Sequence, residues 1–218
     1  MADTKKRIGI MGGTFDPVHN AHLTLAEQAY RQYGLDEIWM LPNGNPPHKR
    51  NTRQAGMEHR MHMLRLAIQD IPYLKLCDVE QSGAVYHYTY ETLQQLNRAY
   101  PDTTFYFIMG ADSLFEFDGW KEPGIISREC ILLAAVRDDH PGEELKARIR
   151  VLEARYGARI YLLDTPRMDI ASEEIRRLLA DGKDVSGMVP AAVAAYMGRH
   201  HLYGTDTQQS DSQRRIRG

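Results

Sequence analysis

The stretch Arg7–His22, which reads RIGIMGGTFDPVHNAH, decides the fold of this chain. Its first part, Arg7–Met11, is a short apolar stretch of the kind that forms a buried strand, and the pair Gly12-Gly13 ends that strand. Over residues 20–33, apolar side chains recur every three or four positions, and Gly34 ends the pattern. A strand, a glycine turn and a helix in this order predict a βα unit of a parallel sheet.

The same alternation continues along the chain. Further strands are predicted at 37–41, 74–77, 104–109, 131–136 and 159–163, and further helices at 57–69, 89–99, 143–155, 172–181 and 190–199. We therefore predict one doubly wound, Rossmann-like α/β domain with a central parallel sheet over residues 6–203. Residues 204–218 are polar and cannot bury enough apolar surface to fold alone, so a disordered tail is expected there.

The composition excludes several classes of protein. Of the 218 residues, 43% are hydrophobic and 26% are charged, which argues against global disorder. The net charge of −2 argues against a broad electrostatic contact with nucleic acid or with an anionic membrane. Cys77 and Cys130 lie in apolar, strand-like stretches and are expected to be buried thiols. With no signal-type segment and no apolar run of about 18 residues, a cytoplasmic protein is expected.

The turn after the first strand carries the residues best suited to chemistry. In an open parallel sheet, ligands bind outside the carboxyl ends of the strands, where helices begin. Gly12 and Gly13 would let the backbone approach a ligand, while His19 and His22 lie on one side of the first helical turn. Imidazole donors beside unpaired backbone N–H groups suit a phosphate that gains charge during a reaction. The stretch lacks both G-x-G-x-x-G and a Walker loop, which disfavours a hydride-transfer enzyme and a P-loop ATPase.

Plainer explanations exist for the same residues. His22 shares a helical face with Leu25 and Ala26, so it could be a core histidine. A zinc site is disfavoured, because besides His19 and His22 no third residue able to bind zinc occurs at a spacing typical of zinc sites. Arg176 could be an ordinary surface arginine, and Trp120 could pack beneath a surface loop.

Several motifs together resemble one family. Gly12–His22 resembles the signature of the nucleotidyltransferase superfamily, whose (H/T)-x-G-H element binds the triphosphate of ATP. More narrowly, the chain resembles the bacterial nicotinate-nucleotide adenylyltransferase family. The further matching segments are Pro46–Lys49, Tyr88–Leu93, Gly110–Asp112, Trp120 and Asp169–Arg176. Their order and spacing cover about residues 6–203 and are more specific than any one motif.

The resemblance implies adenylyl transfer from ATP to nicotinate mononucleotide, which yields deamido-NAD and pyrophosphate. It assigns catalysis to His19, His22 and Arg176, and ATP binding to these histidines and Arg176 together with Gly12, Gly13, Thr14, Phe15 and Ser172. It assigns the mononucleotide to Lys49, Thr89, Asp112, Trp120 and Lys121, with the indole of Trp120 stacked on the pyridine. The fork of Arg176 can hold two phosphate oxygens at once. Mg²⁺ is expected on the ATP oxygens, since no carboxylate cage for a metal is evident. A homo-oligomer remains open.

The chain departs from the family pattern at three positions. Ala21 replaces a glycine, Glu91 an aspartate and Glu173 a threonine. Ser172 is expected to be a helix N-cap, and Glu173 to face solvent. Nicotinamide mononucleotide or phosphopantetheine remains open as the acceptor. A non-catalytic nucleotide sensor on the same fold is a further alternative, motivated by Ala21 and Glu173.

Overall fold

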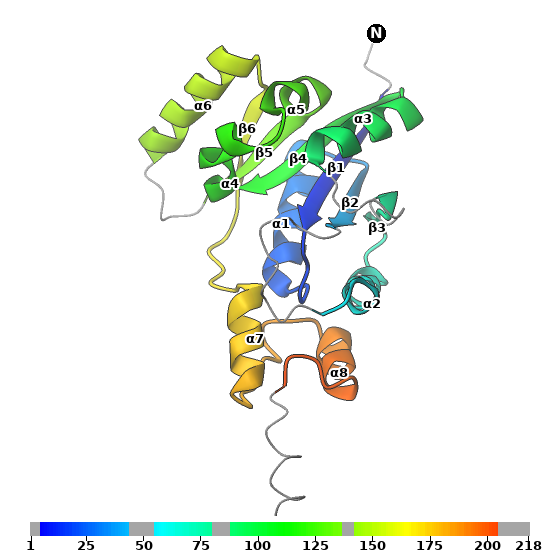
Figure 1. Cartoon of the computed structure of the whole chain (residues 1–218). Helices are drawn as coiled ribbons and strands as arrows, with labels where there is room; N and C mark the ends of the chain where they lie inside the picture. Colours follow the sequence, from blue (N-terminus) through cyan, green and yellow to red (C-terminus); the bar gives the residue numbers. More distant parts are fainter. Residues whose placement is uncertain (1–4, 44–54, 80–87, 137–141, 205–218) are drawn as a thin grey trace, which may run out of the picture.

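In the computed structural model, which describes residues 5–43, 55–79, 88–136 and 142–204, parallel strands form a sheet in the order β3-β2-β1-β4-β5-β6 (Figure 1). The strands are β1 (Lys6–Gly13), β2 (Glu37–Pro42), β3 (Leu74–Leu76), β4 (Thr103–Gly110), β5 (Ile131–Val136) and β6 (Ile160–Asp164). Every neighbouring pair in that order is parallel. The order reverses direction between β1 and β4, and ligands bind at such a switch point in open α/β sheets.

Helices cover both faces of the sheet and bury two hydrophobic cores. One core takes side chains from α1 (Asn20–Tyr33), α2 (Met57–Ile68), α7 (Ser172–Ala180) and α8 (Ala191–Arg199). The other takes them from α3 (Thr89–Ala99), α4 (Ala111–Phe115), the 3-10 turn η2 (Phe117–Gly119), α5 (Pro123–Glu129) and α6 (Gly142–Tyr156). In Figure 1, α7 and α8 lie beyond the carboxyl end of β1.

Strand β4 shows why a strand of this sheet appears in the sequence as a continuous run of apolar residues. Tyr106 and Ile108 pack into the core on the α1 side, whereas Phe105, Phe107 and Met109 pack into the opposite core. Successive side chains of a strand point to opposite faces. A strand covered on both faces is therefore apolar throughout, as parallel sheets usually are.

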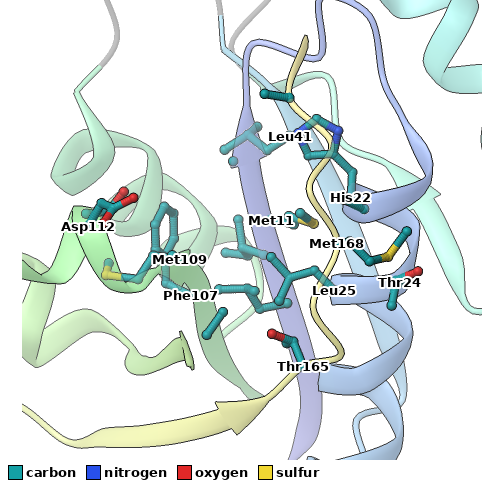
Figure 2. A pocket seen from close by; sticks show the side chains of 18 of the residues that line it. Met11, His22, Thr24, Leu25, Leu41, Phe107, Met109, Asp112, Thr165 and Met168 are labelled. Carbon is teal, nitrogen blue, oxygen red and sulfur yellow. The ribbon is translucent and has the colours of Figure 1, made fainter. Parts of the chain in front are cut away.

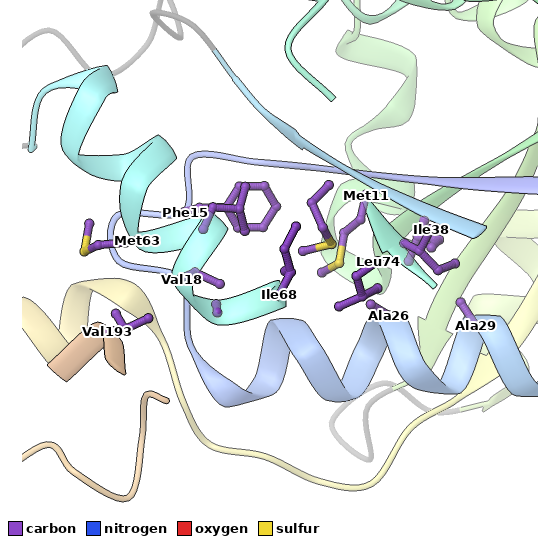
Figure 3. Packing of buried hydrophobic residues seen from close by; sticks show 14 of the residues in the cluster. Met11, Phe15, Val18, Ala26, Ala29, Ile38, Met63, Ile68, Leu74 and Val193 are labelled. Carbon is purple, nitrogen blue, oxygen red and sulfur yellow. The ribbon is translucent and has the colours of Figure 1, made fainter. Parts of the chain in front are cut away.

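Helix α1 begins and ends where the sequence predicts. Ala26 and Ala29 are fully buried, and Figure 3 shows them on the side of the helix that faces the strands. Their small side chains let the helix approach the sheet closely. Gly34 ends the helix in the left-handed conformation, with φ of 52°, and its N–H donates to the carbonyl of Tyr30.

The predicted strands and helices are all present, each within two residues of its predicted ends. Three short elements between β4 and β5, namely α4, η2 and α5, were not predicted. α4 and η2 are too short to show a helical period, whereas Pro123 at the start of α5 is a usable signal. The doubly wound α/β fold is thus confirmed.

Other predictions have different outcomes. Cys77 and Cys130 are buried and unbridged, as expected. Among the described residues, no helix is long and apolar enough to cross a membrane. The tail 205–218 and the segment 46–49 lie outside the described residues, so the predicted domain limits stay a prediction.

Candidate active site

A cavity of about 560 Å³ lies at the carboxyl ends of β1 and β4, at the switch point of the sheet. Its walls come from β1, β4, the start of α1, the start of α3 and the loop 165–171 that joins β6 to α7. These elements are far apart in the sequence. The volume falls within the range of small-ligand pockets and is large enough for a nucleotide.

The cavity brings together five of the residues predicted for the site. These are Gly12, His22, Thr89, Asp112 and Trp120. Figure 2 shows His22 on α1 and Asp112 on α4 on opposite sides of β1. His22 and Asp112 therefore lie on different walls of one cavity.

The other predicted residues do not line the cavity. Gly13 is the last residue of β1, and Thr14, Phe15 and His19 belong to the β1–α1 loop. Ser172 and Arg176 belong to α7, and the exposed Lys121 follows Trp120. Phe15 is buried in the core and sets its ring at 72° to that of His22, with 5.0 Å between the centroids. Lys49 lies outside the described residues.

The two histidines form one unit at the start of α1. His19 is the N-cap residue and is buried, and its ring stacks on that of His22 with 3.6 Å between the centroids. The backbone N–H of His19 donates to Nδ1 of His22 over 3.2 Å. Because Nδ1 is an acceptor here, a neutral His22 carries its proton on Nε2. His22 therefore offers a donor beside the positive end of the α1 dipole.

A buried carboxylate holds the loop between these histidines and β1. Asp16 is 1% exposed, and its Oδ1 accepts from the backbone N–H of Ala55 (3.0 Å) and from the hydroxyl of Tyr203 (2.5 Å). Oδ2 lies 3.6 Å from Nη1 of Arg176. Burial, followed by the charge of Asp16, raises the pKa of Tyr203 far above its usual value. The Tyr203 hydroxyl thus stays protonated and remains a donor to Asp16.

Arg60 of α2 connects the same loop to the end of β2. The side chain is buried, and its Nη1 donates to the carbonyls of Thr14 (2.7 Å) and Asn43 (3.0 Å). Burial lowers the pKa of Arg60 and the charge of Asp16 opposes that effect. An arginine remains charged in proteins even so. Arg60 therefore fixes two loops that meet at the cavity.

Helix α7 docks onto the β1–α1 loop through two of the predicted ATP residues. Nη1 of Arg176 donates to the carbonyl of Asp16 over 2.6 Å, and Oγ of Ser172 donates to the carbonyl of Pro17 over 3.0 Å. The expectation that Ser172 is an N-cap is wrong, because Ala171 holds that position. The hydroxyl of Ser172 satisfies a loop carbonyl instead of a helix N–H.

The three departures from the family pattern have distinct surroundings. Ala21 lines the cavity, so its methyl group takes space that a glycine would leave. Glu91 accepts from the backbone N–H of Tyr88 over 3.3 Å and so caps the start of α3. Glu173 is exposed and lines no part of the cavity, as expected.

Sequence reasoning missed several residues that shape the site. Arg60 and Tyr203 carry no local signal, because their partners are distant in the sequence and appear only after folding. Asp16 stands inside the quoted motif and was given no role. The loop 165–171 lines the cavity, and Thr165 anchors it by donating to the carbonyl of Val136 over 2.9 Å.

Comparisons with known proteins agree on one family. Residues 10–178 match the model of the cytidylyltransferase-like family. A probable nicotinate-nucleotide adenylyltransferase of Lachnoclostridium phytofermentans is 41% identical over 198 residues, which cover 91% of this chain and 99% of the relative. A relative of the same name in Salinibacter ruber is 37% identical and covers 90% of this chain and 97% of its own length.

Solved structures show the same fold. The nicotinic acid mononucleotide adenylyltransferase of Plasmodium falciparum complexed with NaAD matches with a TM-score of 0.76 at 23% identity, covering 91% of this chain and 97% of the other. The same enzyme complexed with APC matches with a TM-score of 0.74. The chain therefore belongs to the cytidylyltransferase-like family and, within it, to the nicotinate-nucleotide adenylyltransferases.

Proposed function

We propose that this chain transfers the adenylyl group of ATP to nicotinate mononucleotide, producing deamido-NAD and pyrophosphate in NAD biosynthesis. The observation that carries the proposal is that His22, Asp112 and Trp120 line one cavity, with His22 and Asp112 on opposite sides of β1. The cavity combines a donor suited to phosphate with an aromatic ring suited to a pyridine. Membership of the nicotinate-nucleotide adenylyltransferases supports the same reaction.

The reaction is a direct displacement. An oxygen of the mononucleotide 5′-phosphate attacks the α-phosphorus of ATP and forms a new P–O bond. The bond from that phosphorus to the bridging oxygen breaks, and pyrophosphate leaves with the electron pair. Such a reaction needs positioning and charge stabilisation rather than a protein nucleophile.

His22 stabilises the charge that grows on the α-phosphate. Its Nε2–H is a donor because Nδ1 already accepts from the backbone of His19. His19 supports this geometry by stacking on the His22 ring. Gly12 and Gly13 allow the backbone to approach the triphosphate, and the N-terminus of α1 adds positive potential.

Arg176 holds the departing pyrophosphate, with Ser172 beside it on α7. Nη1 of Arg176 is bonded to the β1–α1 loop through Asp16. The remaining N–H groups of this guanidinium make no hydrogen bond to another described residue and can serve an anion. We also propose that Thr14 and Phe15 shape the triphosphate site and that Lys49 approaches a substrate phosphate.

The pyridine end of the mononucleotide lies against Trp120, and Asp112 lines the same cavity. Thr89 is the first residue of α3, so its backbone N–H has no intrahelical acceptor. That N–H, together with the backbone of Lys121, would receive the nicotinate carboxylate. The amide group of nicotinamide mononucleotide would place its own N–H donors against these backbone N–H donors, which would leave both without an acceptor. Each such unpaired donor disfavours binding of the amide substrate by about 1–3 kcal/mol.

We propose that Mg²⁺ binds to this chain only as a complex with ATP. Among the described residues, no group of three or more His, Cys, Asp or Glu side chains could hold a metal. Of the cavity carboxylates Asp112, Asp169 and Glu174, the last two are paired with Arg167 and Arg177. Because these residues do not form a metal site, the ion would be bound by phosphate oxygens, whose charge it would reduce.

We further propose that ATP and nicotinate mononucleotide are the partners of this chain in the cytoplasm. The thiols of Cys77 and Cys130 are buried and unbridged, as in proteins of reducing compartments. Burial raises the pKa of Cys130 to about 12, so its thiol is unreactive.

The test is pyrophosphate release from ATP with three acceptors in parallel: nicotinate mononucleotide, nicotinamide mononucleotide and phosphopantetheine. We expect release with the nicotinate substrate and a kcat/KM at least about 10²-fold above that for the amide. A ratio near one would contradict the nicotinate assignment. ATP binding without pyrophosphate release from any acceptor would instead support the nucleotide sensor.

A further inference from the structure

The segment Ala111–Trp120 carries three cavity residues, Asp112, Ser113 and Trp120, on or beside very short elements. Asp112 belongs to α4, which has five residues, and Trp120 follows η2, which has three. Helices this short are not stable by themselves, because too few hydrogen bonds offset the cost of ordering the backbone. Contacts from elsewhere in the fold must therefore hold this wall of the cavity.

Arg148 of α6 supplies such contacts with all three nitrogens of its guanidinium group. Nε donates to the carbonyl of Leu114 over 3.2 Å, and Nη2 donates to the carbonyl of Phe115 over 2.8 Å. Nη1 pairs with Oδ2 of Asp118 at 2.8 Å. The side chain of Arg148 is only 16% exposed. One arginine thus binds the end of α4 and the middle of η2 at the same time.

Asp118 joins this arginine to the end of α6. Its Oδ1 accepts from the hydroxyl of Tyr156 over 2.6 Å and from Nη1 of Arg155 over 3.1 Å. The hydrogen bond from Tyr156, followed by that from Arg148, lowers the pKa of Asp118. The carboxylate therefore remains charged and keeps η2 attached to α6.

The position of η2 determines where Trp120 lies. The backbone N–H of Trp120 donates to the carbonyl of Phe117 over 3.1 Å. The indole ring is 5.7 Å from the ring of Phe117 and 5.9 Å from that of Phe107. Phe107 belongs to β4 in the sheet, whereas Phe117 belongs to η2. A displacement of η2 would consequently change the wall that Trp120 forms.

We propose that Arg148 is a positioning residue for the pyridine wall of the cavity. It does not line the cavity, and it acts by holding α4 and η2 so that Asp112 and Trp120 face the ligand. The ATP wall is built on β1, α1 and α7, which Arg148 does not contact through any of these hydrogen bonds. Its role in binding nicotinate mononucleotide rests on the proposed function.

The kinetic test compares Arg148→Ala with Arg155→Ala in the full chain. Arg155 pairs with the same carboxylate but is 62% exposed and bonds no carbonyl of α4, which makes it the matched control. We expect Arg148→Ala to raise KM for nicotinate mononucleotide at least about tenfold while KM for ATP changes less than about twofold. Arg155→Ala should leave both values within about twofold. An equal rise of both KM values in Arg148→Ala would overturn the proposal.

A second readout does not depend on the reaction. In a Trp39→Phe background, Trp120 is the remaining tryptophan, so its emission and its quenching by acrylamide report on the cavity wall alone. We expect Arg148→Ala to increase the quenching constant of Trp120 and Arg155→Ala to leave it unchanged. Unchanged quenching in a folded Arg148→Ala protein would overturn the proposal even if no adenylyl transfer is measured. Absence of adenylyl transfer in the parent chain would contradict the proposed function alone.

Two milder variants keep the test decisive if Arg148→Ala does not fold. Asp118→Asn preserves both carbonyl bonds of Arg148 and weakens the ion pairs of Asp118 with Arg148 and Arg155. Arg148→Lys, in contrast, cannot span two carbonyls and a carboxylate. We expect quenching and KM for the mononucleotide to rise more in Arg148→Lys than in Asp118→Asn. The reverse order would show that the ion pair, not the guanidinium fork, positions this wall, and would overturn the proposal.

Discussion

The two walls of the cavity are held in opposite ways. The β1–α1 loop, which supports the wall that carries His22, is anchored by charged groups inside the protein: Asp16 is 1% exposed and Arg60 is 3% exposed. The segment 111–120 is anchored from the surface side, where the side chains of Arg148 and Asp118 are 16% and 31% exposed. Both anchors use arginine fixed on backbone carbonyls, but only the first lies in the low-dielectric interior.

This difference predicts different consequences of mutation. Removing one partner of a buried ion pair leaves the other charge buried, which costs several kcal/mol of folding free energy. Removing one partner near the surface costs much less, because water screens and solvates the remaining group. Damage to the first wall should therefore appear mainly as instability, and damage to the second mainly as weaker binding.

The largest effect is expected at Asp16. Asp16→Ala leaves Tyr203 and the N–H of Ala55 without their acceptor and removes the buried charge 3.6 Å from Arg176, so the free energy of unfolding should fall by about 3–5 kcal/mol. Urea unfolding monitored by circular dichroism measures this loss. The control Asp70→Ala removes an exposed carboxylate and should change stability by less than about 0.5 kcal/mol. A loss below about 1 kcal/mol for Asp16→Ala would contradict the importance of the buried anchor.

The next effect concerns chemistry on the same wall. His22→Ala removes the Nε2–H donor and should lower kcat about 10²–10³-fold, the usual loss for one such donor. The protein should still fold, because alanine is tolerated in the first turn of a helix. His62→Ala on α2, whose side chain is exposed, is the control and should leave kcat unchanged. Unchanged turnover in a folded His22→Ala protein would return His22 to the role of a core histidine.

A smaller effect is expected on the opposite wall. Trp120→Ala removes a stacking interaction worth about 0.5–1.5 kcal/mol of binding free energy. The KM for both pyridine mononucleotides should therefore rise about 2–12-fold. The preference for the acid should remain, because in the proposed site backbone N–H groups, and not the indole, receive the carboxylate. Steady-state kinetics with both substrates measures the two quantities. Loss of the acid preference would place selectivity in the tryptophan.

The smallest effect is the pH dependence of the surface anchor. The hydrogen bond from Tyr156, followed by that from Arg148, lowers the pKa of Asp118 below its ordinary value. A lowered pKa in the folded state contributes stability above the unfolded value and loses it as the pH falls through the folded value. The stability difference between the parent chain and Asp118→Asn should therefore be constant above about pH 5 and shrink below about pH 4. Urea unfolding across this range checks it, and a difference that grows on acidification would contradict the assignment.

Local patterns in the sequence were sufficient for much of the molecule. The apolar runs predicted every strand, and the period of residues 20–33 predicted α1 to the residue. The motif from Gly12 to His22 predicted the family that the comparisons confirm. Each of these features depends on side chains within a few positions of one another. Periodicity and short motifs record that kind of information directly.

The tertiary structure decided the rest. It set Asp16 against Tyr203, 187 positions away, and gave Arg176 a partner in the β1–α1 loop. It also assigned Arg148 to carbonyls more than 30 positions earlier, on elements too short to show a period. Backbone carbonyls and buried carboxylates are present at many positions, and no local pattern tells which arginine will reach them. Only the packing of distant elements around the switch point of the sheet selects those partners, because hydrogen bonds form where the fold leaves a donor and an acceptor within reach.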